Sequence, residues 1–179
     1  MSNLGPKTKK NLEAAFAGES QARNKYTYFA KMARKEGYHY IGNVFEEAAK
    51  NEVQHAKDEF KMLNGIGDTI ANLKEAIEGE CHETQIMYPT FAKEAEEEDN
   101  MDAARLFKQI AKVEAKHEAR YRKLLEMVEN GTVFTREEPI RWKCSKCGYI
   151  HEGTQPPPKC PACKHPKEYY EPVSLDFGQ

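Results

Sequence analysis

Apolar side chains recur every three or four residues through most of the chain before about residue 135, a spacing typical of amphipathic helices. The apolar stripes are interrupted by residues that suit a left-handed helix end, namely Gly37, Asn64 with Gly65, Asp99 with Asn100, and Asn130 with Gly131. Asp68, and Asp99 or Asn100, stand where they can cap the next helix. The pattern predicts four helices, over roughly residues 6–36, 39–63, 69–98 and 101–129.

The composition changes near residue 135. Only Pro6 and Pro89 precede this point, whereas seven prolines and four of the five cysteines follow it. A proline-rich segment cannot form long helices. We therefore expect two domains, a helical one over residues 1–134 and a small cysteine-bearing one over residues 139–179.

A glutamate interrupts the apolar stripe near the middle of every predicted helix. These residues are Glu19, Glu52, Glu80 with Glu83, and Glu114. A glutamate alone is usually a surface residue, but these occupy the core face and would fall in one layer of a bundle. Two of them begin the same Glu-x-x-His spacing, which ends at His55 and His117. Residues three apart project from one helix face.

Uncompensated charges in a bundle core cost several kcal/mol each, so a bound cation is expected here. Carboxylate and imidazole ligands suit iron or manganese better than magnesium or a structural zinc. A Glu from each of two helices with Glu-x-x-His from the other two is the di-iron carboxylate arrangement. Glu83 is one glutamate more than this minimal set needs. It is either a hydrogen-bonding partner of a ligand or a ligand in one oxidation state only.

Two CxxC pairs, twelve residues apart, lie in the C-terminal segment. Four thiolates form a closed tetrahedral site, and their identity does not separate a zinc ribbon from a mononuclear iron centre. The ligands are Cys144, Cys147, Cys160 and Cys163. The small core is expected to contain Trp142, Tyr149, Tyr169 and Tyr170, with the metal supplying much of the stability.

The net charge of −2 gives no electrostatic case for nucleic acid or a membrane surface. No apolar stretch is long enough to cross a bilayer, and no secretory signal is visible. We therefore expect a cytoplasmic protein whose thiols stay reduced. Cys81 is interpreted as a small core residue. The remaining histidines are expected to face solvent, namely His39, His82, His151 and His165.

Together these motifs resemble the rubrerythrins over essentially the whole chain. The resemblance rests on AGES at 17–20, Glu-Val-Gln-His within 50–57, GExxE at 79–83, MYP at 87–89 and EAKH at 114–117. Gly148-Tyr149 and Pro161 resemble rubredoxin. The implied fold is an all-α ferritin-like four-helix bundle followed by a small rubredoxin-like metal domain.

The resemblance implies a di-iron peroxidase that reduces hydrogen peroxide to water in oxidative-stress defence. It implies two irons in the bundle, bridged by Glu52 and Glu114, and one in the cysteine site. His55 and Glu83 would exchange at one iron between oxidation states, and Tyr26 and Tyr88 would hydrogen-bond the ligands. Electrons would come from rubredoxin or an NAD(P)H-dependent reductase through the cysteine-held iron.

Two alternatives remain at this stage: a ferroxidase or iron-storage protein, and a helical interaction protein with a zinc ribbon. The topology is also open. Parallel second and third helices would need a crossover of at least ~11 extended residues along a helix of about 38 Å, and only five residues separate Leu63 from Thr69. The chain therefore forms either a simple up-down-up-down bundle or, as we favour, a homodimer that exchanges helix pairs.

Overall fold

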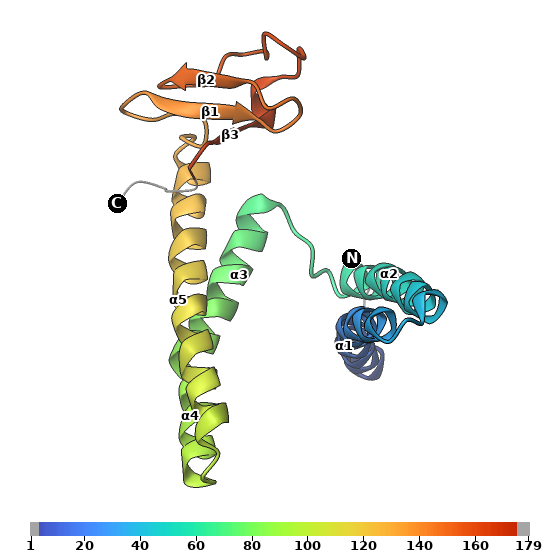
Figure 1. Cartoon of the computed structure of the whole chain (residues 1–179). Helices are drawn as coiled ribbons and strands as arrows, with labels where there is room; N and C mark the ends of the chain where they lie inside the picture. Colours follow the sequence, from blue (N-terminus) through green and yellow to red (C-terminus); the bar gives the residue numbers. More distant parts are fainter. Residues whose placement is uncertain (1–3, 175–179) are drawn as a thin grey trace. The chain divides into compact units, whose positions relative to one another are not determined.

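The computed structural model describes residues 4–174 and divides the chain into two compact units, the first ending at Gly67 and the second beginning at Asp68 (Figure 1). The first unit is a helical hairpin. The second contains the remaining helices and a small sheet. Among the described residues, no helix is both long enough and apolar enough to cross a membrane.

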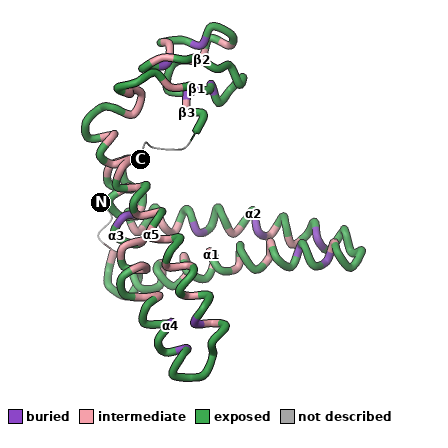
Figure 2. Tube along the Cα trace, turned by 60° about the vertical axis from the view of Figure 1, so that its left-hand side comes forward, coloured by how far each residue is buried: buried purple, intermediate pink, exposed green. Residues whose placement is uncertain are grey.

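Helices α1 (Pro6–Lys35) and α2 (His39–Met62) form the hairpin of the first unit. Small side chains allow them to pack closely: Ala30 and Ala33 of α1 and Ala49 and Ala56 of α2 are buried, as the purple segments of Figure 2 show. A Cβ atom at Gly42 would lie only 3.1 Å from the carbonyl oxygen of Ala30, so glycine permits this approach.

The second unit begins with α3 (Thr69–His82), which continues through a π-helical turn, η1 (Glu83–Met87), into α4 (Tyr88–Glu97). Helix α5 (Met101–Glu129) packs against all three segments. The sequence predicts one unbroken helix over 69–98. The helix begins and ends where the sequence predicts. In its middle, however, five residues form a π-helical turn in place of regular α-helix.

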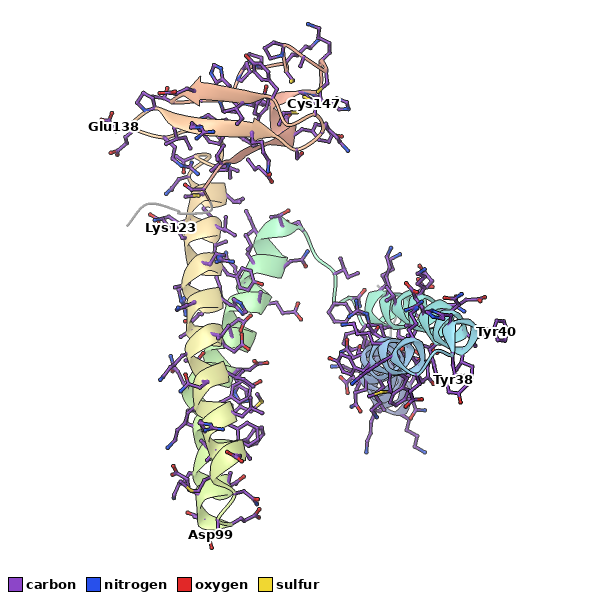
Figure 3. The ribbon with its side chains drawn as sticks, viewed as in Figure 1. Tyr38, Tyr40, Asp99, Lys123, Glu138 and Cys147 are labelled. Atoms are coloured by element: carbon purple, nitrogen blue, oxygen red, sulfur yellow. The ribbon has the colours of Figure 1, made fainter. Side chains whose placement is uncertain are left out.

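The predicted helix ends are confirmed to within one residue. The residues that follow the helices also adopt the left-handed conformation that the sequence predicts. Gly37, Asn64, Asp99 and Gly131 all have positive φ angles, between 58° and 88°. Figure 3 labels Asp99 at the turn between α4 and α5. Asp68 caps α3 by accepting a hydrogen bond from the backbone N–H of Ala71 at 2.8 Å. The expected second cap is wrong, because Asn100 holds the N-cap position of α5 without a side-chain hydrogen bond.

A three-stranded antiparallel sheet follows α5, with strand order β2-β1-β3. Strand β1 spans Ile140–Cys144, β2 spans Ile150–Gly153 and β3 spans Tyr170–Pro172, preceded by the short 3-10 helix η2 (Lys167–Tyr169). The central strand places Trp142 and Cys144 on its buried side. With Cys160 and Tyr170 they form the core of this module.

The predicted core of the cysteine module is half correct. Trp142 is 0% and Tyr170 4% exposed, but Tyr149 and Tyr169 are each 37% exposed. A sheet of three short strands encloses few large side chains, and the indole, the Tyr170 ring and the buried cysteines occupy that space. The domain limits of 1–134 and 139–179 stay a prediction.

Candidate metal centres

A cluster of three side chains lies on the α1–α2 hairpin. The Nδ1 atom of His55 is 2.8 Å from Oε2 of Glu52 and 3.8 Å from Oε1 of Glu19. Their ligand atoms all lie within 4.8 Å of one another. Glu52 and His55 are one helical turn apart on α2, and Glu19 faces them from α1, so the Glu-x-x-His spacing produces the convergence that the sequence predicts.

The second unit repeats this cluster with nearly the same dimensions. The Nδ1 atom of His117 is 2.6 Å from Oε2 of Glu114 and 3.6 Å from Oε1 of Glu80. Again the ligand atoms lie within 4.8 Å of one another. Helix α5 supplies Glu114 and His117, and α3 supplies Glu80. Each unit therefore presents two carboxylates and one imidazole, a donor set that suits iron or manganese.

An aromatic trio beside each cluster extends the repeat. In the first unit the ring centroids of Tyr26, Phe29 and Phe45 lie 5.6–6.3 Å apart. In the second unit the equivalent trio has separations of 5.6–6.4 Å. Its members are Tyr88, Phe91 and Phe107. The two units are thus structural repeats. The matching tripeptides Gly-Glu-Ser at 18–20 and Gly-Glu-Cys at 79–81 are the sequence signal of this repeat.

The π-helical turn breaks this repeat at one point. Glu19 and Tyr26 are seven residues apart, but Glu80 and Tyr88 are eight apart. The π turn η1 absorbs the additional residue, and it begins at Glu83. π turns inside α-helices are frequent at functional sites. Glu83 lies outside the three-residue cluster of its unit, so the structure brings six of the seven predicted ligands into two groups and leaves Glu83 beside one.

The crowding of carboxylates alters their proton affinity. A hydrogen bond with Glu52, burial and repulsion raise the pKa of Glu19. Burial, followed by repulsion from Glu114, raises the pKa of Glu80. Burial and the nearby charges of Glu83, Glu114 and Glu80 raise the pKa of Tyr88, so its hydroxyl stays protonated and able to donate a hydrogen bond.

These shifts predict how the metal-free protein responds to pH. Because the pKa of Glu80 is raised, the folded chain binds its proton more tightly than the unfolded chain. Stability is therefore lost as the pH rises from the ordinary carboxyl value through the raised pKa. We expect metal-free Glu80→Gln to be more stable than metal-free wild type at about pH 7, and the difference to shrink near about pH 4.

Urea unfolding followed by helical circular dichroism measures this effect. Glu78→Gln, at an exposed position on the same helix, is the matched control and should show no such pH-dependent gain. Equal responses of the two variants would contradict the assignment of the effect to the cluster.

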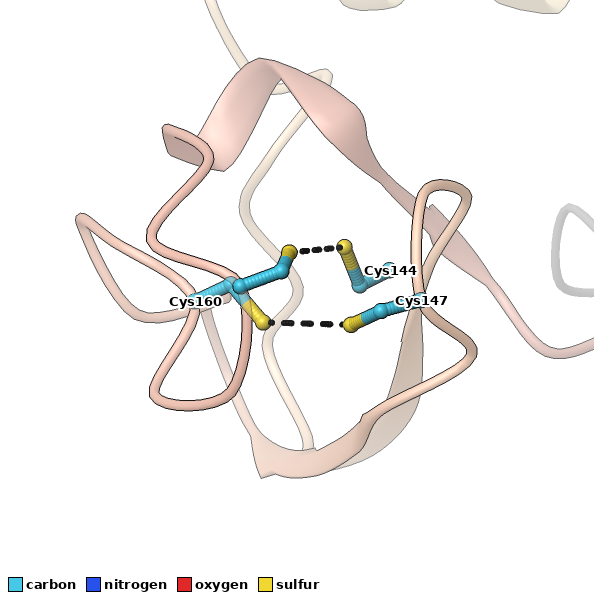
Figure 4. Close-up of side chains that lie close together, drawn as sticks. Cys144, Cys147 and Cys160 are labelled. Atoms are coloured by element: carbon cyan, nitrogen blue, oxygen red, sulfur yellow. Dashed lines mark hydrogen bonds between the residues drawn. The ribbon is translucent and has the colours of Figure 1, made fainter.

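The four cysteines of the C-terminal module converge in two pairs (Figure 4). The Sγ atoms of Cys144 and Cys163 are 3.7 Å apart, and those of Cys147 and Cys160 are 3.6 Å apart. Four sulfurs around one metal at about 2.3 Å would be separated by about 3.7–3.8 Å. All four are free thiols. The geometry therefore fits a tetrahedral metal site and not a pair of disulfides.

Two turns of the same design hold the cysteines. In the first, the N–H of Gly148 donates to the carbonyl of Cys144 at 2.8 Å, and in the second the N–H of Lys164 donates to that of Cys160 at 2.9 Å. The fourth residue after each first cysteine has a positive φ, 77° at Gly148 and 64° at Lys164.

The expectation that His165 faces solvent is wrong. His165 is half-buried, its Nδ1 atom lies 3.3 Å from Sγ of Cys163, and its ring contacts Tyr169 at 5.0 Å between centroids. The left-handed turn at Lys164 directs the imidazole back onto the cysteine. Of the other three histidines, His39 and His82 are exposed, as expected, and His151 is half-buried. Cys81 is half-buried.

Comparison with known proteins agrees with both parts of the chain. The Rubrerythrin family matches residues 10–125, and the rubrerythrin rubredoxin-like domain matches residues 142–171. A rubrerythrin from Porphyromonas gingivalis is 48% identical, over 97% of this chain and 93% of that protein. A rubrerythrin from Nitratidesulfovibrio vulgaris is 44% identical, over 97% of both.

Among solved structures, a partially reduced state of nigerythrin is 33% identical, covers 96% of this chain and 88% of its own, and has a TM-score of 0.37. The family and the geometry confirm the expected cofactors, a di-iron site of Glu and His residues and a rubredoxin-like iron site of four cysteines. The chain belongs to the rubrerythrin family, oxidoreductases that join a helical ferritin-like di-iron domain to a rubredoxin-like electron-transfer domain.

Proposed function

We propose that this chain reduces hydrogen peroxide to water with electrons that enter through the cysteine module. The observation that carries the proposal is the presence, on one chain, of two matching Glu-Glu-His clusters and a four-sulfur site of tetrahedral dimensions. Iron storage uses a carboxylate site but gives no purpose to a separate four-cysteine site. A zinc-ribbon scaffold leaves the paired clusters unexplained.

When bound, the irons supply the two electrons that the reduction of one peroxide requires. The part of the protein is to hold the irons and to orient the side chains around them. Glu19, Glu52, Glu80, Glu114 and His117 would hold the irons in both oxidation states, and Glu52 and Glu114 would be shared between the two metals. Cys144, Cys147, Cys160 and Cys163 hold the third iron.

Glu83 and His55 have a different role in the proposal. Glu83 begins the π turn, where the backbone departs from regular α-helical hydrogen bonding, and it lies near enough to Tyr88 to raise that residue's pKa. We propose that His55 would hold the iron in the reduced state and that Glu83 would hold it in the oxidised state, where the more highly charged metal prefers an anionic oxygen. The Tyr88 hydroxyl, kept protonated by its raised pKa, would donate a hydrogen bond to a ligand carboxylate, and the Tyr26 hydroxyl would donate one in the other repeat.

We further propose that the functional unit is a homodimer in which helix pairs are exchanged. Helix α2 has 24 residues, about 36 Å in length. Six residues, 63–68, connect it to α3, and they reach about 20–25 Å. This connection cannot run back along α2, as the parallel arrangement of α2 and α3 in a ferritin-like bundle requires. If the α1–α2 pair of one chain packs with the α3–α5 pair of its partner, the short connection carries no strain.

Rapid mixing of the fully reduced protein tests the activity. We expect hydrogen peroxide to oxidise it much faster than dissolved oxygen does, by at least about tenfold, with two water molecules formed per peroxide. The rate is followed by absorption of the oxidised irons, and the residual peroxide is measured separately. Faster oxidation by oxygen, with ferric iron accumulating in the helical domain, would instead support a ferroxidase.

A further inference from the structure

Residues 130–139 form a connecting segment between the end of α5 and the first strand of the cysteine module (Figure 1). A connection without internal contacts leaves the domains on either side free to reorient. This segment instead folds back onto the helix. The backbone N–H of Thr132 donates to the carbonyl of Met127 at 2.8 Å, and that of Thr135 donates to the carbonyl of Thr132 at 3.0 Å. The connecting segment therefore begins as an ordered turn that continues α5.

The side chain of Arg136 closes this turn. Its Nη1 atom lies 2.7 Å from the carbonyl oxygen of Thr135, 3.1 Å from that of Thr132 and 3.4 Å from that of Val133, and it donates to them. Carbonyl groups near the end of a helix need donors, and a cation is favourable there because the helix dipole is negative at that end. Arg136 is thus attached to the helical side of the connecting segment.

Arg136 also contacts the module. Its guanidinium carbon lies 5.2 Å from the centroid of the Trp142 ring, and its backbone N–H donates to the carbonyl of Thr154 at 2.9 Å. Trp142 is fully buried at the centre of the module, where its indole N–H donates to the carbonyl of Gly153 at 2.9 Å. One residue therefore bridges the turn after α5 and the core of the module.

Phe134 adds a second contact of the same kind. It belongs to the turn that Arg136 closes, and it packs against the core of the module. The Nζ atom of Lys167, in η2, lies 5.8 Å from the centre of the Phe134 ring. Phe134 and Arg136 thus hold the module at two points, and both points lie in the segment that continues α5.

The contacts at residue 136 suit arginine better than lysine. A planar guanidinium stacks on an indole with its face while the N–H groups at its edge donate to carbonyls. The compact ammonium of lysine has no such plane. Arg136 is half-buried, so its contacts with the ring and the carbonyls replace water that the cation has lost. A lysine at this position keeps the charge but loses the combination of contacts.

We propose that Arg136 is a positioning residue that fixes the cysteine module to the end of α5, and so sets the position of the cysteine-held iron relative to the Glu-His clusters. Helix α5 itself carries Glu114 and His117. The inference rests on the proposed function, because it concerns the step in which electrons leave the module. In that step one electron passes from ferrous iron held by the cysteines to ferric iron held by the clusters, and no bond or proton changes place. Because electron transfer slows steeply with distance, a loosely held module delivers electrons more slowly.

The fluorescence anisotropy of Trp142 tests this proposal without any measurement of activity. Trp142 is the single tryptophan of the chain and is 0% exposed, so its ring moves with the module. The full-length protein is studied with zinc in the cysteine site, because iron quenches the indole emission. We expect the wild-type anisotropy to decay slowly, with the tumbling of the whole protein. Arg136→Gln should add a decay at least about threefold faster, and Arg136→Lys should add the same decay with a smaller amplitude.

Arg141→Gln is the matched control. It removes the same charge from an exposed position on β1, close to Arg136 in the sequence, and its anisotropy should decay as in wild type. The emission maximum is recorded for every variant, since an unshifted maximum shows that Trp142 is still buried and the module still folded. With iron in all sites, the first oxidation of reduced Arg136→Gln by peroxide should be as fast as in wild type. The later oxidation of the cysteine-held iron should be slower by at least about fivefold.

A single slow decay in Arg136→Gln, with an unshifted emission maximum, would overturn the proposal. A shifted maximum in both Arg136 variants would overturn it as well, because Arg136 would then be needed to fold the module and not to position it. If the fast decay appears but reduced wild type does not react with peroxide, the positioning role stands and the proposed peroxidase function fails.

Discussion

Removal of the metal from the cysteine module is expected to unfold that module and to leave the helices intact. Trp142 is the single tryptophan of the chain, and it is fully buried beside Cys144 and Cys160. Its fluorescence therefore reports on the module alone. We expect a strong chelator to shift the emission to longer wavelength while the helical circular dichroism stays nearly constant.

The physical reason is the small size of the core. Four buried residues and three short strands enclose too little apolar area to offset the chain entropy of about 35 residues. Structural zinc contributes an apparent free energy of about 10–16 kcal/mol in zinc-finger peptides, more than the core of such a small module supplies.

Cys160→Ser should reproduce the effect of the chelator, because it removes a buried ligand. Cys81→Ser, a matched change outside the module, should leave the Trp142 emission as in wild type. An unshifted emission after complete loss of the metal would show that the module folds without it.

A heterodimer of two inactive chains is expected to recover activity if helix pairs are exchanged. Glu52→Ala damages the first-unit cluster and Glu114→Ala the second-unit cluster, and each homodimer should have lost nearly all activity. In an exchanged heterodimer one bundle collects both substitutions and the other collects neither. The purified heterodimer, isolated with two affinity tags, should therefore show about half of the wild-type activity.

A second pairing provides the control. Glu52→Ala and Glu19→Ala lie in the same unit, so exchange damages both bundles and no activity should return. If the Glu52→Ala and Glu114→Ala heterodimer is also inactive, the helices are not exchanged and a simple up-down-up-down bundle remains.

The elements that depend on local chemistry could be predicted from the sequence. Helix ends follow from residues such as Gly37 and Asn64, which adopt the left-handed conformation. The convergence of Glu52 with His55, and of Glu114 with His117, follows from the three-residue spacing of one helix face. The convergence of the four cysteines follows from the CxxC spacing within each of their two turns.

Features that depend on packing could not be predicted. The π turn at Glu83 leaves no local signal and becomes visible only when the spacing from Glu80 to Tyr88 is compared with that from Glu19 to Tyr26. The position of His165 depends on the backbone conformation of Lys164. The exposure of Tyr169 depends on how little space Trp142 and Tyr170 leave in the core of the module.

Metal analysis of the purified protein tests the central claim most directly, that the protein binds two irons in its Glu-His clusters and one iron in its cysteine site for each chain. The protein is expressed without added zinc, and its iron and zinc are quantified per chain. The paired clusters and the four-sulfur site predict about three irons per chain. One zinc and no iron would contradict the account.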